Sequence, residues 1–413
     1  MAESSDLDRA IAWLRSPAAI RERCGMVLAA AEAGDLAHFA YDEERIAAAA
    51  DYVVATMREA YPDLNIPPHS RWRHFSVGGV DRWAALAAGL DAVSVEEIAR
   101  MRVDLTVTSV LLDAGAGMAW RYADADSGRE YARSEGLAVA SFDMFAAGLF
   151  SADPASPLRA DAAALSAIDT AALAAAFQAT DANPLVGLEG RTGLLRRLGD
   201  ALTAAPRLFG PAPARIGHLF DHLKTRATGG TLPAAAILAA VLDGLGPIWP
   251  GRIDLGGVNL GDVWRHPAAR TGDATDGLVP FHKLSQWLTY SLIEPVESAG
   301  IRVTDLDDLT GLAEYRNGGL LIDLGVLRPK HDRVLAAGHT PDTEVVVEWR
   351  ALTVALIDRL AARVRDRLGA DGAGLSLAAV LEGGTWRAGR RIAAERRPDG
   401  GPPIRLESDG TVF

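Results

Sequence analysis

Apolar residues recur along this chain at the three- and four-residue spacing of amphipathic helices, and alternating strand patterns are scarce. Ser16 followed by Pro17 is typical of a helix start. A capping-box pair, Ser94 and Glu97, predicts another start ahead of a long apolar series. Further helices are predicted over residues 134–150, 161–179, 193–202, 215–226, 232–245, 281–299 and 343–368. We therefore expect a mainly α, multi-helical fold with a few short strands.

Two stretches interrupt the helical pattern and are expected to form loops. The first begins at Pro67 and Pro68, and the second, residues 246–277, opens with a cluster of Gly and Pro. Two loops of this kind can cap a pocket. The tail, residues 400–413, alternates enough to predict a small hairpin around Asp409 and Gly410.

No boundary between separate domains is visible in the sequence. Neither a Ser/Gly-rich linker nor a block of single-sign charge divides the 413 residues. We therefore expect residues 1–413 to form a single compact unit, or two closely docked helical lobes that span about 1–210 and 211–413.

Composition narrows the class of protein. A hydrophobic fraction of 49%, a charged fraction of 23% and a formal net charge of -12 are typical of a soluble globular chain. The acidic balance disfavours a nucleic-acid partner, which needs clustered Lys and Arg. Apolar runs such as 232–242 fall short of the roughly 20 residues of a membrane span, and we expect no secretory signal because the first residues are acidic and lack an apolar run. Cys24 is the single cysteine, which is typical of a reducing compartment. We therefore expect a cytoplasmic protein without a membrane partner. The oligomeric state is left open.

The first predicted loop gathers aromatic and cationic side chains within seven positions, namely His69, Arg71, Trp72, Arg73, His74 and Phe75. Rings and guanidinium groups together offer stacking faces and hydrogen-bond donors to a small ligand. We predict that Trp72, Arg73 and His74 contact a substrate. The alternative is a surface loop that Trp72 pins to the core.

A second candidate region, residues 281–295, places polar side chains in an apolar helical context. His282 and Gln286 share one helical face, and Phe281 supplies aromatic surface beside them. Buried polar groups need hydrogen-bond partners. These three residues are therefore candidates for contacts with a substrate.

A third region, residues 309–329, sets a carboxylate, a phenol and a guanidinium side by side at Glu314, Tyr315 and Arg316, ahead of a glycine pair. Leucines surround these residues, so we expect Glu314 to be partly desolvated and its pKa to be raised. Such a cluster can hold and polarise a small polar ligand. The competing interpretation is an internal Glu–Arg pair that ties helices together.

Other motifs give weaker signals. His218 and His222 are four residues apart and share a helical face, as two metal ligands must. Neither a third ligand nor an HExxH pattern accompanies them. GxGxxG, GxxxxGK[ST] and GxSxG motifs are also missing, so we expect no dinucleotide-binding, phosphate-loop or esterase site.

Four segments together resemble one known family. LTGLAEYRNGG, FHKLSQWLTYSLIEP, NPLVGLEGR and VVVEWRALTVALIDRL resemble the uracil-catabolism protein of the fungal and bacterial URC pathway, whose members align over nearly the whole chain. A more distant resemblance, mainly in the C-terminal half, is to the queuosine-salvage N-ribohydrolases, mostly helical proteins with a DNA-glycosylase-like core. It rests on AEYRNGGLLIDLGVLRP and on the VEWR segment, residues 347–350.

The second resemblance implies roles for individual residues. The catalytic aspartate of that family's DYR motif falls on Glu314, which keeps the carboxylate but lengthens its reach by one methylene. A second substrate-contacting acid falls near His282. The Pro-Gln pair after the motif is replaced by Asn317 and Gly318. The resemblance therefore implies the same architecture with a different base specificity.

Together the resemblances imply a hydrolase of uracil catabolism that cleaves ribosylurea or its 5′-phosphate to urea and a ribose species. Glu314 would stabilise the oxocarbenium-like state or activate water, and His282 would assist the departing urea. Arg73, Arg316 and Lys330 are the available donors for a phosphate. The implied reaction requires no metal and no organic cofactor. Two alternatives remain, a noncatalytic nucleotide-binding or scaffold protein of the same pathway, and a metal-dependent amidohydrolase that uses the histidine pair.

Overall fold

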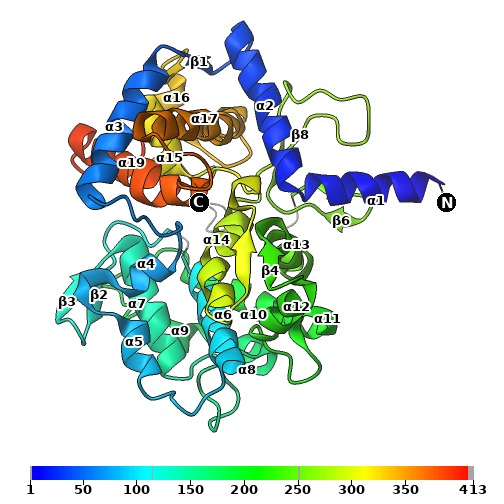
Figure 1. The fold of residues 1–413 in the computed structure, drawn as a ribbon, viewed down its shortest axis with the longest axis vertical. Coiled ribbons are helices and arrows are strands. Elements are labelled where there is room, and N and C mark those ends of the chain that lie inside the picture. The colour runs from blue at the N-terminus through cyan, green and yellow to red at the C-terminus, as the bar shows by residue number, and fades with distance from the viewer. Residues whose placement is uncertain (1, 114, 250–251, 408–413) are drawn as a thin grey trace. The chain divides into compact units, whose positions relative to one another are not determined.

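The computed structural model describes residues 2–113, 115–249 and 252–407. They form a mainly α protein with a few short strands (Figure 1), which confirms the predicted class. The described residues divide into two compact units. Unit 1 comprises residues 2–69, 252–286 and 305–407, and unit 2 comprises residues 70–249 and 287–304. Each unit is thus assembled from segments that are distant in the sequence, and the DNA-glycosylase-like architecture stays a prediction.

Unit 1 is built around α17 (Glu344–Leu368), a 25-residue helix. Most positions along its first five turns are buried, whichever way they face, so this part of the helix lies in the core of unit 1. Three helices pack against it: α2 (Pro17–Ala33), α3 (Arg45–Ala60) and α15 (Tyr315–Asp323). Figure 1 shows α17 among these neighbours. Residues of α17 can therefore reach several segments of unit 1 at once.

The remaining elements of unit 1 are shorter, and its strands pair only in twos. The helices are α1 (Ala2–Leu14), α16 (Arg333–Ala336), α18 (Leu377–Ala379), the π-helical turn η4 (Val380–Thr385), α19 (Trp386–Arg396) and the 3-10 turn η3 (Leu306–Asp308). The antiparallel pairs are β1 (Phe39–Tyr41) with β10 (Leu327–Pro329), β5 (Asp254–Leu255) with β6 (Val258–Asn259), and β7 (Val263–Arg265) with β8 (Leu278–Pro280).

The C-terminal tail differs from the predicted hairpin. β12 (Arg405–Leu406) pairs in parallel with β11 (Gly338–His339). The predicted turn at Asp409 and Gly410 lies outside the described residues. A partner some 67 residues away in the sequence could not be identified from the local alternation of the tail.

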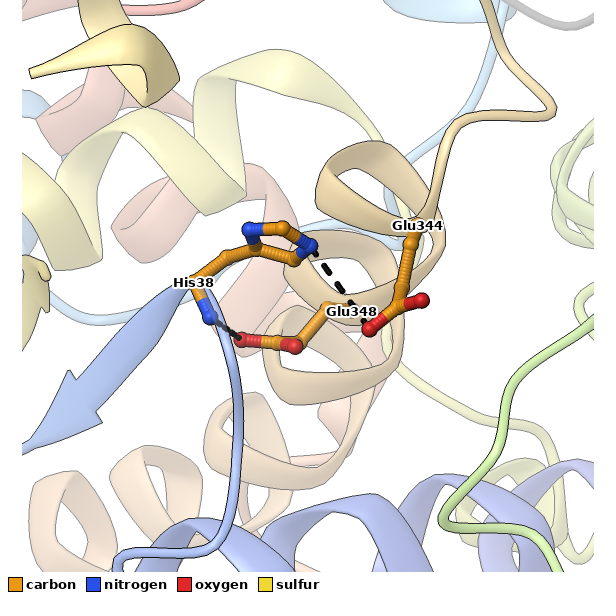
Figure 2. Close-up of side chains that lie close together, drawn as sticks. All are labelled: His38, Glu344 and Glu348. Atoms are coloured by element: carbon orange, nitrogen blue, oxygen red, sulfur yellow. Dashed lines mark hydrogen bonds and ion pairs between the residues drawn. The ribbon is translucent and has the colours of Figure 1, made fainter. Parts of the chain in front are cut away.

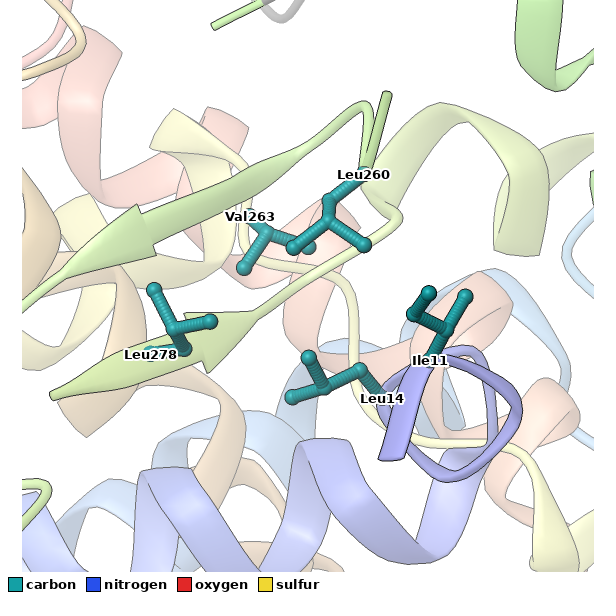
Figure 3. Packing of buried hydrophobic residues seen from close by; sticks show 5 residues of the cluster. All are labelled: Ile11, Leu14, Leu260, Val263 and Leu278. Carbon is teal, nitrogen blue, oxygen red and sulfur yellow. The ribbon is translucent and has the colours of Figure 1, made fainter. Parts of the chain in front are cut away.

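A small apolar cluster holds α1 against the β7–β8 pair. Its buried members are Ile11, Leu14, Leu260, Val263 and Leu278, and Figure 3 shows their side chains converging. Burial of such aliphatic groups contributes about 1.5–3 kcal/mol for each side chain. The cluster fixes the segment that leads from β8 into α14 (Lys283–Glu297), a helix that begins in unit 1 and continues in unit 2.

Unit 2 is also helical. Its helices are α4 (Trp72–Phe75), η1 (Val77–Gly79), α5 (Arg82–Ala87), α6 (Val95–Leu111), α7 (Arg133–Ala146), α8 (Ala162–Ala167), α9 (Thr170–Ala176), α10 (Leu188–Ala204), α11 (Pro206–Phe209), α12 (His218–Arg226), α13 (Ala234–Leu245) and η2 (Gly246–Ile248). β2 (Tyr122–Asp124) pairs with β3 (Arg129–Tyr131), and β4 (Thr231–Pro233) pairs in parallel with β9 (Arg302–Thr304).

Three sequence expectations are corrected by the fold. The helix predicted over residues 161–179 is two helices, because Ile168 between α8 and α9 has an extended backbone. The loop predicted after Pro68 contains the four-residue helix α4. The loop predicted over residues 246–277 contains the short strands β5, β6 and β7. Within the described part of the chain, the helices are too short or too polar to cross a membrane.

Candidate functional site

Glu314 is the N-cap residue of α15, and both of its carboxylate oxygens accept a backbone hydrogen bond. The N–H of Arg316 donates to Oε2 at 2.7 Å, and the N–H of Asn317 donates to Oε1 at 2.6 Å. Shorter side chains usually fill this position. The two hydrogen bonds fix the orientation of the carboxylate at the positive end of the helix.

Burial raises the pKa of Glu314 above its ordinary value. The two backbone hydrogen bonds act in the opposite direction, as do the positive charges of Lys283 and Arg316, and they offset only part of the desolvation. The raised pKa agrees with the prediction made from the leucines that surround Glu314 in the sequence. A carboxyl group in this condition can take up a proton during a reaction and return it.

A second carboxylate, Asp262, forms a bidentate ion pair with Arg350 of α17. Both N–O distances are 2.8 Å. Asp262 also accepts hydrogen bonds from the Trp264 indole at 2.6 Å and from the backbone N–H of Lys283 at 3.0 Å. Burial opposes its ionisation, but the guanidinium and these donors outweigh burial and hold the pKa of Asp262 below its usual range. Asp262 therefore stays charged.

The Asp262–Arg350 pair joins two regions that the sequence singled out. The backbone carbonyl of Asp262 accepts hydrogen bonds from the N–H of Phe281 at 2.9 Å and from that of His282 at 3.4 Å. On the other side, Arg350 Nε donates to the carbonyl of Ala313 at 3.3 Å, one residue before the capping glutamate. The segments near residues 281 and 313 therefore meet around one ion pair.

His282 has a positive φ, and one of its ring nitrogens is in contact with a backbone carbonyl oxygen. Its φ is +44°, a value that non-glycine residues seldom adopt and that is frequent at functional sites. The side chain is buried, and Nε2 lies 3.0 Å from the carbonyl oxygen of Leu14. Burial lowers the pKa of His282, although the charge of Asp262 opposes this. The geometry suits a positioning role, and proton donation by His282 stays a prediction.

Phe281 and Gln286, also predicted to contact substrate, are buried in unit 1. The guanidinium carbon of Arg350 lies 4.2 Å from the centre of the Phe281 ring. Gln286 Nε2 donates to Thr310 Oγ1 at 2.5 Å, and the N–H of Thr310 donates to Gln286 Oε1 at 3.0 Å. Gln286 therefore ties α14 to the loop that leads to α15.

Tyr315, Arg316 and Asn317 form the first turn of α15. Arg316 donates to the carbonyl of Gly400 at 2.6 Å, and its guanidinium carbon lies 4.8 Å from the centre of the Tyr315 ring. Asn317 Nδ2 donates to the carbonyl of Leu312 at 3.2 Å, whereas its buried Oδ1 has no hydrogen-bond partner. A buried acceptor of this kind calls for a donor, which a bound ligand can supply.

Lys330 follows β10, and its ammonium group is used within the fold. Nζ donates to the carbonyl of Gly34 at 2.8 Å and to that of Leu36 at 2.5 Å. These carbonyls follow the end of α2, where basic groups are favourable. Lys330 therefore stabilises the segment that follows α2, and its predicted contact with phosphate competes with these two hydrogen bonds.

Trp72, Arg73 and His74 belong to α4 of unit 2, whereas the other predicted site residues belong to unit 1. The buried Trp72 ring packs against Phe75, and the guanidinium carbon of Arg102 lies 4.3 Å from its centre. Arg73 forms an ion pair with Glu294 of α14. Their contacts with a substrate stay a prediction.

The two histidines of α12 do not gather further ligands in the part of the chain that the structure describes. His218 Nδ1 lies 2.9 Å from the carbonyl oxygen of Phe209, and burial lowers the pKa of His222. Among the described residues, neither belongs to a group of three ligating side chains whose atoms lie within 4.8 Å of one another.

Sequence reasoning missed Asp262, the residue around which this site is organised. It stands in the stretch predicted as a loop, 88 residues before Arg350. The local sequence GDVWRH offers one signal, a carboxylate two residues before the indole that donates to it. The partner that holds Asp262 ionised is supplied by the tertiary fold alone.

The fold and this site define a mainly helical protein with two half-buried carboxylates whose pKa values are shifted in opposite directions. Residues 13–413 match the family described as "Protein of unknown function (DUF1688)", and the chain belongs to that family. It is 42% identical over 412 residues to Protein urg3 of Schizosaccharomyces pombe, covering 98% of this chain and 99% of that protein. It is 38% identical over 444 residues to Uracil catabolism protein 4 of Lachancea kluyveri, covering 98% and 100%.

Proposed function

We propose that this protein is an N-ribosyl hydrolase of uracil catabolism, which cleaves ribosylurea or its 5′-phosphate to urea and ribose or ribose phosphate. The observation that carries the proposal is Glu314, an oriented carboxyl group whose pKa is raised by burial. The name of the Lachancea kluyveri relative, Uracil catabolism protein 4, supports the pathway. The substrate is the one that the resemblance to the uracil-catabolism family implies, and the reaction type is the one that the resemblance to N-ribohydrolases implies.

Hydrolysis breaks the bond between the anomeric carbon and the urea nitrogen and forms a bond from that carbon to a water oxygen. The transition state carries positive charge on the sugar ring, which an ionised Glu314 stabilises. Glu314 accepts a proton from the attacking water and returns it to the departing nitrogen. A raised pKa favours this exchange, and the two cap hydrogen bonds hold the carboxylate in place beforehand.

The ion pair of Asp262 and Arg350 has a structural role. Asp262 and Arg350 hold the chain at Phe281 and His282 against the segment that ends at Glu314. Two carboxylates with pKa values pushed apart are typical of sites that divide acid–base and electrostatic roles. We assign Glu314 to chemistry and Asp262 to positioning.

The test compares Glu314→Gln with the wild-type protein on ribosylurea and on its 5′-phosphate, with released urea as the readout and calorimetry for binding. Glu297→Gln is a matched control. Glu297 also has a pKa raised by burial and accepts a backbone N–H, from Val303 at 3.2 Å, but it lies in unit 2. Loss of a general acid–base group reduces turnover by about 10²–10⁴-fold.

We expect Glu314→Gln to lose turnover on that scale while still binding substrate, and Glu297→Gln to retain it. Equal turnover in wild type and Glu314→Gln would remove Glu314 from the mechanism. Tight binding of ribosylurea phosphate without any release of urea by the wild type would favour the noncatalytic binding protein. Urea release that a chelator abolishes, with His218→Ala equally inactive, would favour the amidohydrolase.

A further inference from the structure

Three side chains of the types that bind metal ions meet where β1 contacts the start of α17. His38 immediately precedes β1, and Glu344 and Glu348 are one helical turn apart on α17. Residues four apart share a helical face, and Figure 2 shows the three side chains directed toward one another. One ligand atom from each residue lies within 4.8 Å of the others.

The spacing of these atoms fits a shared cation better than direct hydrogen bonds. His38 Nε2 and Glu344 Oε1 are 3.6 Å apart, beyond the range of a normal hydrogen bond. Ligands that bind a transition metal at 2.0–2.2 Å lie about 3.3–3.6 Å from one another in a tetrahedral arrangement. A small movement of the partly exposed His38 and Glu344 side chains would complete the site.

Glu348 supplies an independent observation. Its side chain is fully buried. Oε1 accepts hydrogen bonds from the N–H groups of His38 at 3.1 Å and Phe39 at 2.7 Å, but Oε2 is buried without a hydrogen-bond partner. A buried carboxylate oxygen that lacks a partner is costly. A bound cation would neutralise it.

A neighbouring histidine is consistent with this arrangement. His266 Nε2 is buried, lacks a hydrogen-bond partner and lies 3.5 Å from Glu348 Oε2. His266 Nδ1 accepts a hydrogen bond from the N–H of Ala268 at 3.2 Å, so the neutral ring carries its proton on Nε2 and has no lone pair left for a cation. The 3.5 Å contact with His266 does not satisfy Glu348 Oε2, and the cation is left to the other three residues.

The second nitrogen of His38 is held as metal-binding histidines require. His38 Nδ1 lies 2.9 Å from His331 Nε2. When a histidine binds a metal through one nitrogen, the other usually donates a hydrogen bond to a neighbour, which fixes the ring. One imidazole and two carboxylates suit Zn²⁺ or a similar divalent transition-metal ion more than Ca²⁺ or Mg²⁺, which prefer oxygen ligands alone.

We propose that His38, Glu344 and Glu348 bind a divalent transition-metal ion. The ion would link the start of β1 to the start of α17 and compensate the buried charge of Glu348. None of these three residues is assigned a catalytic role, so the proposed metal site can be tested independently of the hydrolase proposal. From the sequence, His218 and His222 were weighed as a weak pair of metal ligands, and no metal was expected.

The test titrates Zn²⁺ into the full-length protein after treatment with a chelator, with calorimetry and melting temperature as readouts. The variants His38→Ala and Glu344→Gln each remove one ligand, and Glu344 is 44% exposed, so its replacement leaves the core intact. His222→Ala is the matched control for histidine binding elsewhere. Glu348→Gln keeps an oxygen for the N–H groups of β1 but removes the charge.

We expect one Zn²⁺ per wild-type chain and a melting temperature that rises on binding. His38→Ala and Glu344→Gln should weaken binding by about tenfold or more, and Glu348→Gln should abolish it without lowering the melting temperature of the metal-free protein. His222→Ala should bind like wild type. Absence of stoichiometric binding, or binding that His38→Ala and Glu344→Gln leave unchanged, would overturn the proposal.

Discussion

Replacement of Asp262 by Asn should destabilise unit 1 strongly, although the shape of the side chain is kept. Arg350 is 1% exposed and Asp262 is 12% exposed, so the charge pair is largely withdrawn from water. Removal of one partner from a buried pair leaves the other charge uncompensated, which costs about 3–5 kcal/mol. Asparagine can retain one acceptor contact, so we expect about 3 kcal/mol, a large share of a typical stability of 5–15 kcal/mol.

The loss should depend on pH in a defined direction. The pKa of Asp262 is lower in the folded chain than its usual value, which is about 3.9 in an unfolded chain. Its ionised form therefore adds stability that is fully present well above pH 4 and is lost as the pH falls toward the folded pKa. The stability difference between wild type and Asp262→Asn should be constant from about pH 6 to 8 and should shrink below about pH 4.

Urea denaturation at several pH values, followed by tryptophan fluorescence, measures this difference. Asp332→Asn is the control, because Asp332 is an exposed aspartate and should change stability by about 0.5 kcal/mol at most. The double variant Asp262→Asn/Arg350→Met should lose less stability than the two single changes added together, because neither charge is then left alone. A loss below about 1 kcal/mol for Asp262→Asn at pH 7, or an equal loss at pH 3, would refute this reasoning.

Three further outcomes are expected. Because burial raises the pKa of Glu314, hydrolysis that needs its ionised form should decline as the pH falls, starting above the ordinary pKa range of glutamate. Glu314→Asp should retain more activity than Glu314→Gln, and identical pH profiles of activity for wild type and Glu314→Gln would contradict this. Gly318→Ala should lower the melting temperature, with a loss of about 1–3 kcal/mol, because an added Cβ would lie 2.7 Å from Trp349. Lys330→Met should reduce stability through its lost contacts with Gly34 and Leu36, while a raised KM confined to the phosphorylated substrate would instead assign it to phosphate binding.

The helical class could be predicted from the sequence because its signals are local. Ser16 accepts the N–H of Ala19 at 3.2 Å and caps α2, as its position before Pro17 indicated. Ser94 caps α6 in the same way, through the N–H of Glu97 at 3.2 Å. A cap and an apolar period depend on neighbours within a few residues. Such features can be read without knowledge of the fold.

Helix α15 was not predicted, although it carries the candidate catalytic residue at its N-cap. Gly318 and Gly319 lie in its middle, and glycine disfavours a helix by about 1 kcal/mol for each residue. The tertiary structure explains the first glycine, because a side chain at Gly318 would meet Trp349 and Thr353 of α17 at 2.7 Å. The close approach of α15 and α17 therefore explains why a helix forms here, although glycine locally disfavours one.

The sequence by itself determined the helical class, several helix starts, and Glu314 as a carboxylate whose surroundings raise its pKa. The tertiary structure decided which groups surround it. Asp262 meets Arg350 across 88 residues, and His38 meets Glu348 across 310. Helix formation depends on residues within a turn or two, whereas charge pairing and ligand geometry depend on side chains brought together only when the core packs.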